Sequence, residues 1–260
     1  EAERLGLREI TLEAYPQADV LIRQIISKTI DIATPSGRKS FVKQWQSKCS
    51  GLPIPCAPDS GGDWAKGNYW YLEQISNSKI ISSLSDNAKV ALPNFGQPSV
   101  LLVDSWQERN WDTKISGAKD AILQKTNSPL LKELLGPNQE GVVNIKRQDI
   151  DSALWEGDPA DRKPIKKHIE ILQKLGLNPE QFELRCIRQD EYARAAAVNG
   201  WGKKNLWTNF DHYFLGDDGA RRGLYGGYRG SGGPSRVDYT WRDRAAGDLA
   251  VRLVLSRKQK

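Results

Sequence analysis

The sequence predicts an α+β fold in which a mostly helical N-terminal region precedes a domain of strands and long irregular loops. Apolar residues recur at helical spacing in ADVLIRQIISKTIDI, so a helix is expected over residues 17–32. Apolar and charged residues alternate in FELRCIR, residues 182–188, as they do in a half-buried strand. The alternating segment LAVRLVLSRK closes the chain after a long stretch that is rich in glycine and aromatic residues.

Residues 1–88 make up the expected helical region. The turn-forming residues 35–37 (PSG) are expected to end the first helix. A second helical stretch carries Trp45, and the Pro- and Gly-rich segment 51–64 predicts a connecting loop. The segment YWYLEQISNSKIISSLSDNAKV predicts a further helix that ends near Asn87.

Residues 89–260 form the second expected domain, which begins with a short buried strand in SVLLV. Short amphipathic helices are expected in AKDAILQKT and PLLKELLG, and VVNI is compatible with a strand. The clearest helix lies in RKPIKKHIEILQKLGLNPEQ, where Gly176 is the expected C-terminal cap and His168 is expected on the solvated side. Its apolar face is expected to consist of Ile165, Ile169, Leu172 and Leu175.

After Tyr192 the chain shows little regular pattern up to its last strand. Irregular segments of this length inside a compact domain are usually functional or disordered. Disordered segments lack large aromatic residues, whereas this one contains Trp201, Trp207, Phe210, Tyr213 and Phe214. The sequence therefore predicts an ordered, irregular surface, with Trp201, Trp207 and Phe210 as buried support.

Composition narrows the class of protein. The chain has 260 residues, a formal net charge of +6 and no apolar run long enough to span a membrane. We expect a soluble protein, cytoplasmic or associated with the cell surface. The sequence has no methionine, not even an initiator, so its start leaves both the compartment and any trimming open. Three cysteines, Cys49, Cys56 and Cys186, fit no disulfide framework or zinc pattern and are expected to be reduced and buried.

The segment 216–255 has an unusual composition. It contains no Lys, Glu, Gln, Asn or Met, and every basic residue in it is arginine. Tyrosine offers a large rigid contact area, serine and glycine offer adaptability, and arginine offers planar multi-donor recognition. This mixture is typical of a binding surface.

The pattern RxGLxGGxR…GGxSxVxxxWRDxAxxxxAVRLVLSRK resembles the C-terminal part of variable proteins that are diversified by retroelements and carry a C-type-lectin fold. The segment VRLVLS also resembles a strand of the related formylglycine-generating-enzyme family. The resemblance covers roughly residues 180–257. It implies that residues 89–260 form a C-type-lectin-like domain with a hypervariable surface at about 220–250.

Adenine-directed mutagenesis in such proteins produces residues such as Tyr, Asp, Ser, Gly, Thr, Arg and Ala, but not Lys, Glu, Gln, Met or Trp. Positions of this kind separate the GG, WRD and AVRLVL elements, among them Gly230, Ala246, Gly247 and Asp248. The resemblance implies that the ligand-binding residues are Tyr225, Tyr228, Ser231, Arg236, Asp238, Tyr239, Thr240 and Arg244. It also implies that Trp241 and Asp243 of the WRD element are scaffold, with Trp241 buried.

The sequence gives little support for catalysis, a cofactor or a metal. The formylglycine-generating enzymes use their own cysteines, and none follows Cys186 here. Calcium-binding lectins carry WND where this chain has WRD, so Arg242 replaces an amide ligand. The carboxylates of GDDG at 216–219 are expected in a tight turn, and His212 is expected to be structural. No hydrolase, metalloprotease, redox or P-loop motif occurs.

We therefore expect a non-enzymatic binding protein, without cofactor or metal, whose target is a macromolecule and most simply another protein. The alternative is a basic nucleic-acid-binding protein that uses arginines for phosphates and tyrosines as stacking platforms. That alternative would use Arg221, Arg222, Arg229, Arg236, Arg244, Tyr225 and Tyr228.

Overall fold

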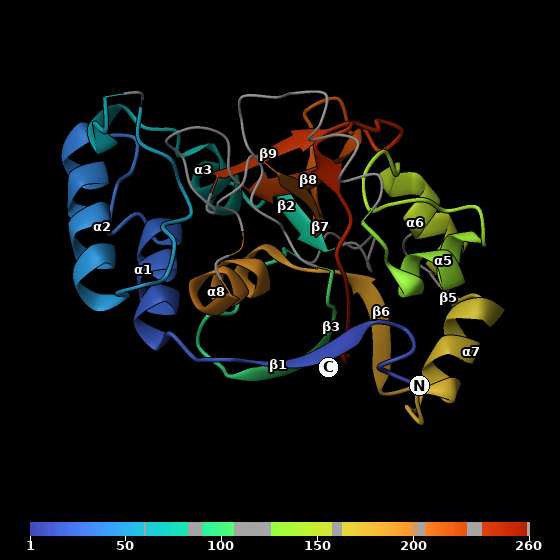
Figure 1. The fold of residues 1–260 in the computed structure, drawn as a ribbon. Coiled ribbons are helices and arrows are strands. Elements are labelled where there is room, and N and C mark those ends of the chain that lie inside the picture. Colours follow the sequence, from blue (N-terminus) through green and yellow to red (C-terminus); the bar gives the residue numbers. More distant parts are fainter. Residues whose placement is uncertain are drawn as a thin grey trace.

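The computed structural model describes residues 1–59, 61–82, 90–106, 126–157, 163–199, 201, 206–227 and 236–258. It is a mixed α and β structure with two main sheets, and helices flank them on both sides (Figure 1). This confirms the coarse fold class that the sequence predicts. Among the described residues, no helix combines the length and apolarity that crossing a membrane requires.

The first sheet joins the two ends of the described chain. Its order is β1 (Leu7–Leu12), β3 (Ser99–Asp104), β11 (Leu253–Arg257) and β6 (Phe182–Cys186), and all neighbours are antiparallel. One face of this sheet packs on a core that contains Leu101 and Val254, and the other packs on a second core that contains Leu184 and Leu255. The sheet is therefore covered on both faces.

Helices from different parts of the chain supply these two cores. The first core includes residues of α1 (Pro16–Ile26), α2 (Pro35–Lys48), α3 (Trp70–Ser76) and α8 (Gln189–Asn199). The second includes residues of α5 (Pro129–Leu135), α6 (Arg147–Leu154) and α7 (Lys166–Lys174), which lie together on the right of Figure 1. The short elements are η1 (Trp64–Lys66), β4 (Trp155–Glu156) and β5 (Lys163–Pro164).

The second sheet is built around a meander. Strands β7 (Trp207–Leu215), β8 (Arg221–Gly227) and β9 (Arg236–Thr240) pair antiparallel, and β7 also pairs with β2 (Ile80–Ser82) and β10 (Leu249–Ala250). The prediction of an irregular surface is therefore wrong for these residues. The GDDG turn between β7 and β8 is confirmed, with Gly219 at a φ of +74°.

Two glycines in β8 explain why the meander is not recognisable in the sequence. A Cβ at Gly226 would lie 2.3 Å from the ring of Phe210, and one at Gly227 would lie 2.3 Å from the carbonyl oxygen of Leu206. Glycine is required here by the close approach of neighbouring groups within a strand. Glycine is also frequent in loops, so the sequence pattern does not distinguish a glycine-rich strand from a loop.

Several predicted elements differ in extent. Pro35 begins α2 rather than ending the first helix, because proline suits the first helical position, and Thr34 caps that helix. The helix expected up to Asn87 ends at Ser76, and the chain continues as β2. Of VVNI, Val143 forms an isolated bridge to Ala250. The helix expected in AKDAILQKT lies outside the described residues except for its last residue.

The buried face of α7 is rotated from the expected one. His168, Ile171 and Leu172 are buried, whereas Ile169 is half-buried. The expectation of a solvated His168 is therefore wrong: its Nδ1 lies 3.1 Å from the carbonyl oxygen of Leu154, and its Nε2 accepts from the amide of Leu184 at 2.9 Å. The cap at Gly176 is confirmed by its φ of +72°.

Strands from residues 1–88 enter both sheets: β1 pairs with β3, and β2 pairs with β7. The division of the chain near residue 88 stays a prediction. The three cysteines are reduced and buried, as expected. Burial raises the pKa of Cys49 to about 11 and that of Cys186 to about 12, so these thiols stay protonated.

Candidate functional site

Alternation along β8 and β9 brings several predicted ligand residues to one face of the second sheet. Tyr225 pairs with Asp238 in the ladder, and Thr240 and Arg236 lie two residues to either side of Asp238 on the same face. They line a pocket of about 390 Å³, which we call the β8–β9 pocket. Its lining residues are Trp207, Tyr225, Arg236, Asp238, Thr240, Arg244, Ala246, Asp248 and Leu249.

Aromatic rings anchor the pocket. Trp207 is buried and meets the ring of Tyr225 edge-on, with centroids 5.1 Å apart and an interplanar angle of 90°. The guanidinium of Arg236 lies 5.7 Å from the centroid of the Trp207 ring. The Nε of Arg236 is buried and finds no hydrogen-bond partner among the described residues. Arg236 thus packs on the aromatic base of the pocket and keeps one donor that no described residue uses.

The charges in the pocket are mixed. Arg236 and Arg244 carry positive charge, and Asp238 and Asp248 carry negative charge. Burial raises the pKa of the Tyr225 hydroxyl and Asp238 raises it further, whereas Arg244 and Arg236 oppose this. Tyr225 therefore stays neutral and can both donate and accept a hydrogen bond. The pocket offers hydrogen bonds, ion pairs and an aromatic surface to a ligand.

The structure separates the eight predicted ligand residues into three groups. Tyr225, Arg236, Asp238, Thr240 and Arg244 line the β8–β9 pocket. Tyr228 and Ser231 lie outside the described residues. Tyr239 is on the opposite face of β9, where its ring centroid lies 5.0 Å from those of Trp70 and Phe214.

The expectation of a buried Trp241 is wrong. Its side chain is 55% exposed and covers the guanidinium of Arg222, which lies 4.4 Å from the ring centroid. Asp243 is exposed, and within the described part of the chain no hydrogen bond or ion pair fixes it. Of the expected aromatic supports, Trp201, Trp207 and Phe210 are buried and confirmed.

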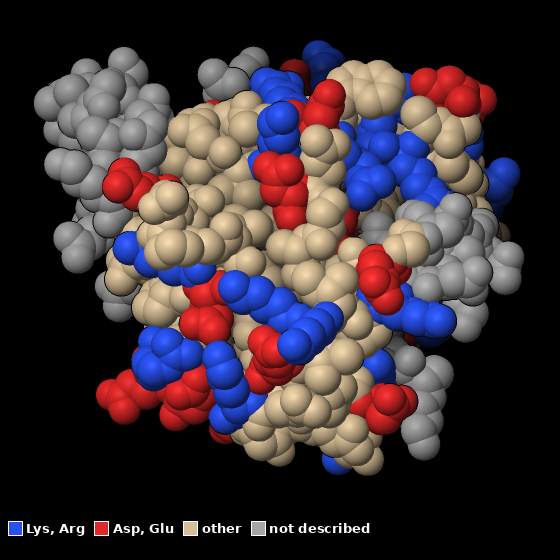
Figure 2. Space-filling view, turned by 90° about the vertical axis from the view of Figure 1, so that its right-hand side faces the viewer, with Lys and Arg blue, Asp and Glu red and all other residues tan. Residues whose placement is uncertain are grey.

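The arginines of the nucleic-acid alternative do not gather at one place. Arg236 and Arg244 line the pocket, whereas Arg222 pairs with Asp218 at 2.7 Å on the opposite face of the hairpin. Arg229 lies outside the described residues. On the face drawn in Figure 2, basic side chains gather at the upper right, and basic and acidic residues alternate lower down.

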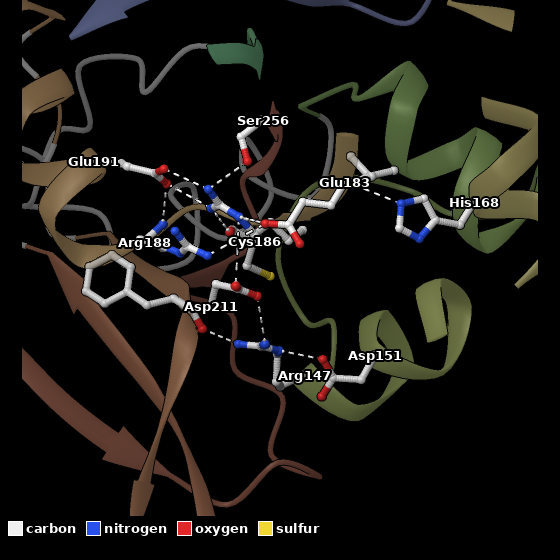
Figure 3. A network of polar contacts seen from close by, with 12 residues as sticks. Arg147, Asp151, His168, Glu183, Cys186, Arg188, Glu191, Asp211 and Ser256 are labelled. Atoms are coloured by element: carbon white, nitrogen blue, oxygen red, sulfur yellow. Dashed lines mark hydrogen bonds and ion pairs between the residues drawn. The ribbon is translucent and has the colours of Figure 1, made fainter. Parts of the chain in front are cut away.

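A buried ionic network joins residues of β6, α8, α6 and β7, and it was not expected from the sequence (Figure 3). Arg185 of β6 donates to Glu183 at 2.9 Å and to both carboxylate oxygens of Glu191 at 2.7 and 2.9 Å. It also donates to the hydroxyl of Ser256 at 2.9 Å. Both charged residues of FELRC are therefore buried, and the expectation that they face solvent is wrong.

Electrostatics in the network follow from this pairing. Burial alone would raise the pKa of Glu191, but Arg185 overcomes it and lowers that pKa to about 2. Burial raises the pKa of Asp211 to about 6 despite nearby Arg185 and Arg147. The pKa of His212 falls to about 3, chiefly by burial and then by Arg188, so His212 is neutral and interior as expected of a structural residue.

Arg147 joins α6 to the second sheet. It donates to Asp151 at 3.0 Å and to the carbonyl oxygen of Phe210, and it lies 3.4 Å from Asp211. Asp151 in turn accepts from Arg242 at 2.8 Å. Arg242 of the WRD element is thus part of the scaffold. The sequence gives no signal for the long-range contacts of this network, such as Arg185 with Ser256 and Arg147 with Asp211, because these partners lie far apart along the chain.

No family model, curated protein or solved structure matches the chain. In the described part of the chain, no group of three or more His, Cys, Asp or Glu side chains is arranged to hold a metal ion. Functional inference therefore depends on the geometry of the chain's own residues.

Proposed function

We propose that this protein is a non-enzymatic binding protein that displays a variable surface on a C-type-lectin-like scaffold, with the β8–β9 pocket at the centre of that surface. The observation that carries the proposal is the convergence of five predicted ligand residues, Tyr225, Arg236, Asp238, Thr240 and Arg244, on one pocket. Tyr225 and Arg244 come from outside β9, so alternation along that strand does not by itself bring all five residues together.

The rest of the lining supports the proposal. Ala246 and Asp248 are also residues that adenine-directed mutagenesis can produce, so the pocket is lined mostly by positions of this kind. The two exceptions are Trp207 and Leu249, which are buried framework residues of β7 and β10. Interchangeable side chains thus surround a fixed apolar base.

The scaffold has the property that such variation needs. Leu224 and Val237 point away from the pocket into the first core and are buried. Because side chains alternate across a strand, the pocket side of β8 and β9 can change while the core side stays constant. The mixture of tyrosine, arginine and aspartate suits a macromolecular target, since these residues contribute rigid contact area and polar specificity at interfaces.

A displayed library tests this function. The five pocket positions are randomised together and the displayed proteins are selected for binding to a single purified test protein. A control library randomises five exposed positions that do not line the pocket: Glu3, Lys39, Lys43, Glu140 and Lys174. The proposal predicts specific binders from the pocket library and none from the control. Equal yields from the two libraries, or none from either, would contradict it.

The retroelement origin has its own test in the neighbouring DNA. A near-identical repeat of the codons for residues 220–257, differing at adenines and lying beside a reverse transcriptase gene, is the expected finding. If the gene has no such repeat nearby, diversification by a retroelement is contradicted. The binding function is then tested by the library experiment alone.

A further inference from the structure

A second opening lies in the first sheet, where β3 and β11 separate. Their ladder consists of Val103 with Val254 and Leu102 with Leu255, and it stops there. Beyond this point β3 continues along β1 to Ser99, and β11 continues along β6 to Arg257. Each strand therefore keeps its outer neighbour, while no described residue pairs with its inner edge as a strand. We call this opening the sheet fork.

The backbone groups that face the fork follow from the ladder. The amide of Ser105 donates to Gly6 beside β1, so the amides of Leu102 and Val100 point the other way, toward β11. The amide of Lys258 donates to Gln181 beside β6, so the backbone of Arg257 points toward β3. Val100 and Arg257 would form the next hydrogen-bonded pair, but they lie outside the ladder. Such inner edges can accept another extended chain.

The fork opens into a cavity of about 560 Å³ that both edges line. On one face of the sheet its lining is apolar, because Leu102, Leu177, Phe182 and Leu255 pack with the second core. Val100 is on this face at the mouth and is 56% exposed. A side chain entering on this face would meet hydrocarbon.

The lining on the opposite face is charged. Arg185 and Glu191 satisfy each other there, and Arg194 pairs with Asp190 at 3.4 Å. Arg188 lies 3.6 Å from Glu183, yet its Nε is buried without a hydrogen-bond partner among the described residues. Lys258 adds positive charge at the rim of this face. Arg257 and Glu9 pair with Phe182 and Leu102 in the ladders, so their side chains lie on the same face as those apolar residues. The uncompensated charge of this lining is positive.

We propose that the sheet fork binds an extended peptide in which apolar and acidic residues alternate. Such a segment pairs its backbone with Val100 and Arg257, as in strand addition. Its apolar side chains then lie on Leu102 and Phe182, and its carboxylates lie on the face of Arg188 and Lys258. This site is separate from the β8–β9 pocket, because the two cavities share no lining residue and belong to different sheets.

Fluorescence polarisation tests the proposal with the full chain and two labelled, end-blocked peptides, one of alternating Glu and Val and one of alternating Lys and Val. The Glu–Val peptide is expected to bind with a dissociation constant below about 1 mM, and the Lys–Val peptide at least about tenfold more weakly. Reversing the rim charge of the carboxylate face in a Lys258→Glu variant is expected to reduce this preference.

A matched pair of variants tests the backbone pairing. Val100→Pro removes the amide that faces the fork while leaving the amides that face β1, and it is expected to weaken binding of the Glu–Val peptide about tenfold. Val100→Ala keeps that amide and is expected to bind as the unaltered chain does. Hydrogen exchange on the unaltered chain is independent of the variants: adding the peptide is expected to slow exchange at Val100 and Arg257.

Three results would overturn the proposal. The first is equal affinity for the two peptides, or no saturable binding of either. The second is unchanged exchange at Val100 and Arg257 when the Glu–Val peptide is bound. The third is complete displacement of the peptide by glutarate at equal concentration, which would show that the fork holds a small anion instead of a peptide.

Discussion

The β8–β9 pocket and the network around Arg185 contain the same kinds of charged residue but use them in opposite ways. In the network, Arg185 is 1% exposed and its donors are taken by Glu183, Glu191 and Ser256. In the pocket, Arg244 is exposed, and Arg236 is half-buried with a donor that no described residue uses. Arginine and carboxylate stabilise a fold when they satisfy each other in the interior, and they serve recognition when they face an open pocket.

The largest expected change in the free energy of unfolding comes from the interior network around Arg185. Replacing Arg185 by Gln leaves Glu183 and Glu191 buried without their cation, and breaking a buried pair from one side costs about 3 to 5 kcal/mol. Urea unfolding of Arg185→Gln is expected to show a loss of this size. Arg244→Gln is the matched control and is expected to unfold with nearly unchanged free energy. Similar values for the two variants would contradict the comparison.

A pH-dependent effect comes next and concerns His168 of α7, which is kept neutral by burial beside the second core. Burial lowers its pKa from the usual value of 6.5 to about 4. The unfolded chain therefore binds more protons below about pH 6.5, so the stability that neutral His168 contributes is lost as pH falls toward 4. Between about pH 7 and about pH 5 this effect is expected to lower the free energy of unfolding by about 2 kcal/mol. Urea unfolding of His168→Gln should lack this part of the pH dependence, and an identical pH profile would contradict the account.

A smaller effect distinguishes the two faces of β9. Tyr239 packs between Trp70 and Phe214, so Tyr239→Ala is expected to lower the free energy of unfolding by about 1 to 2 kcal/mol. Trp241→Ala is expected to cost less than about 1 kcal/mol, because the ring is mostly exposed. Thermal unfolding of both variants measures the difference. A larger loss of stability for Trp241→Ala than for Tyr239→Ala would support the buried scaffold role that the sequence suggested for Trp241.

The smallest expected change in the free energy of unfolding comes from charged residues of the β8–β9 pocket. Arg236→Ser and Asp238→Asn each remove a charge that no interior partner needs, so each is expected to change the free energy of unfolding by less than about 0.5 kcal/mol. Urea unfolding at constant pH measures this. A loss of several kcal/mol at either position would show that the pocket charges stabilise the fold, as those of the network around Arg185 do.

Part of the structure was predictable because local signals and tertiary structure agree. The helix cap at Gly176, the GDDG turn and the strand in SVLLV each depend on nearby residues, and all are present. The chemical types at Tyr225 and Asp238 marked them as candidates for binding. Their convergence became visible in the register of β8 with β9.

The rest depends on packing that one sequence does not reveal. Charges in FELRC are typical of a solvated face, but α8 covers that face of β6 and supplies Glu191 as the partner of Arg185. Rotation of α7 by one residue moves His168 from the expected polar side into the interior, because successive residues are about 100° apart on a helix. Gly226 fits a loop as well as a strand until its contact with Phe210 is known.

The central claim is that the pocket side chains are interchangeable on a fixed scaffold. Its most direct measurement is urea unfolding of one variant in which Tyr225, Arg236, Asp238, Thr240 and Arg244 are all replaced by other residues of the permitted set. The account predicts cooperative unfolding with a free energy within about 2 kcal/mol of the starting protein, since four of these side chains are exposed or half-buried and only Thr240 is buried. Loss of cooperative unfolding, or a decrease of more than about 4 kcal/mol, would show that these residues hold the fold together and would contradict the account.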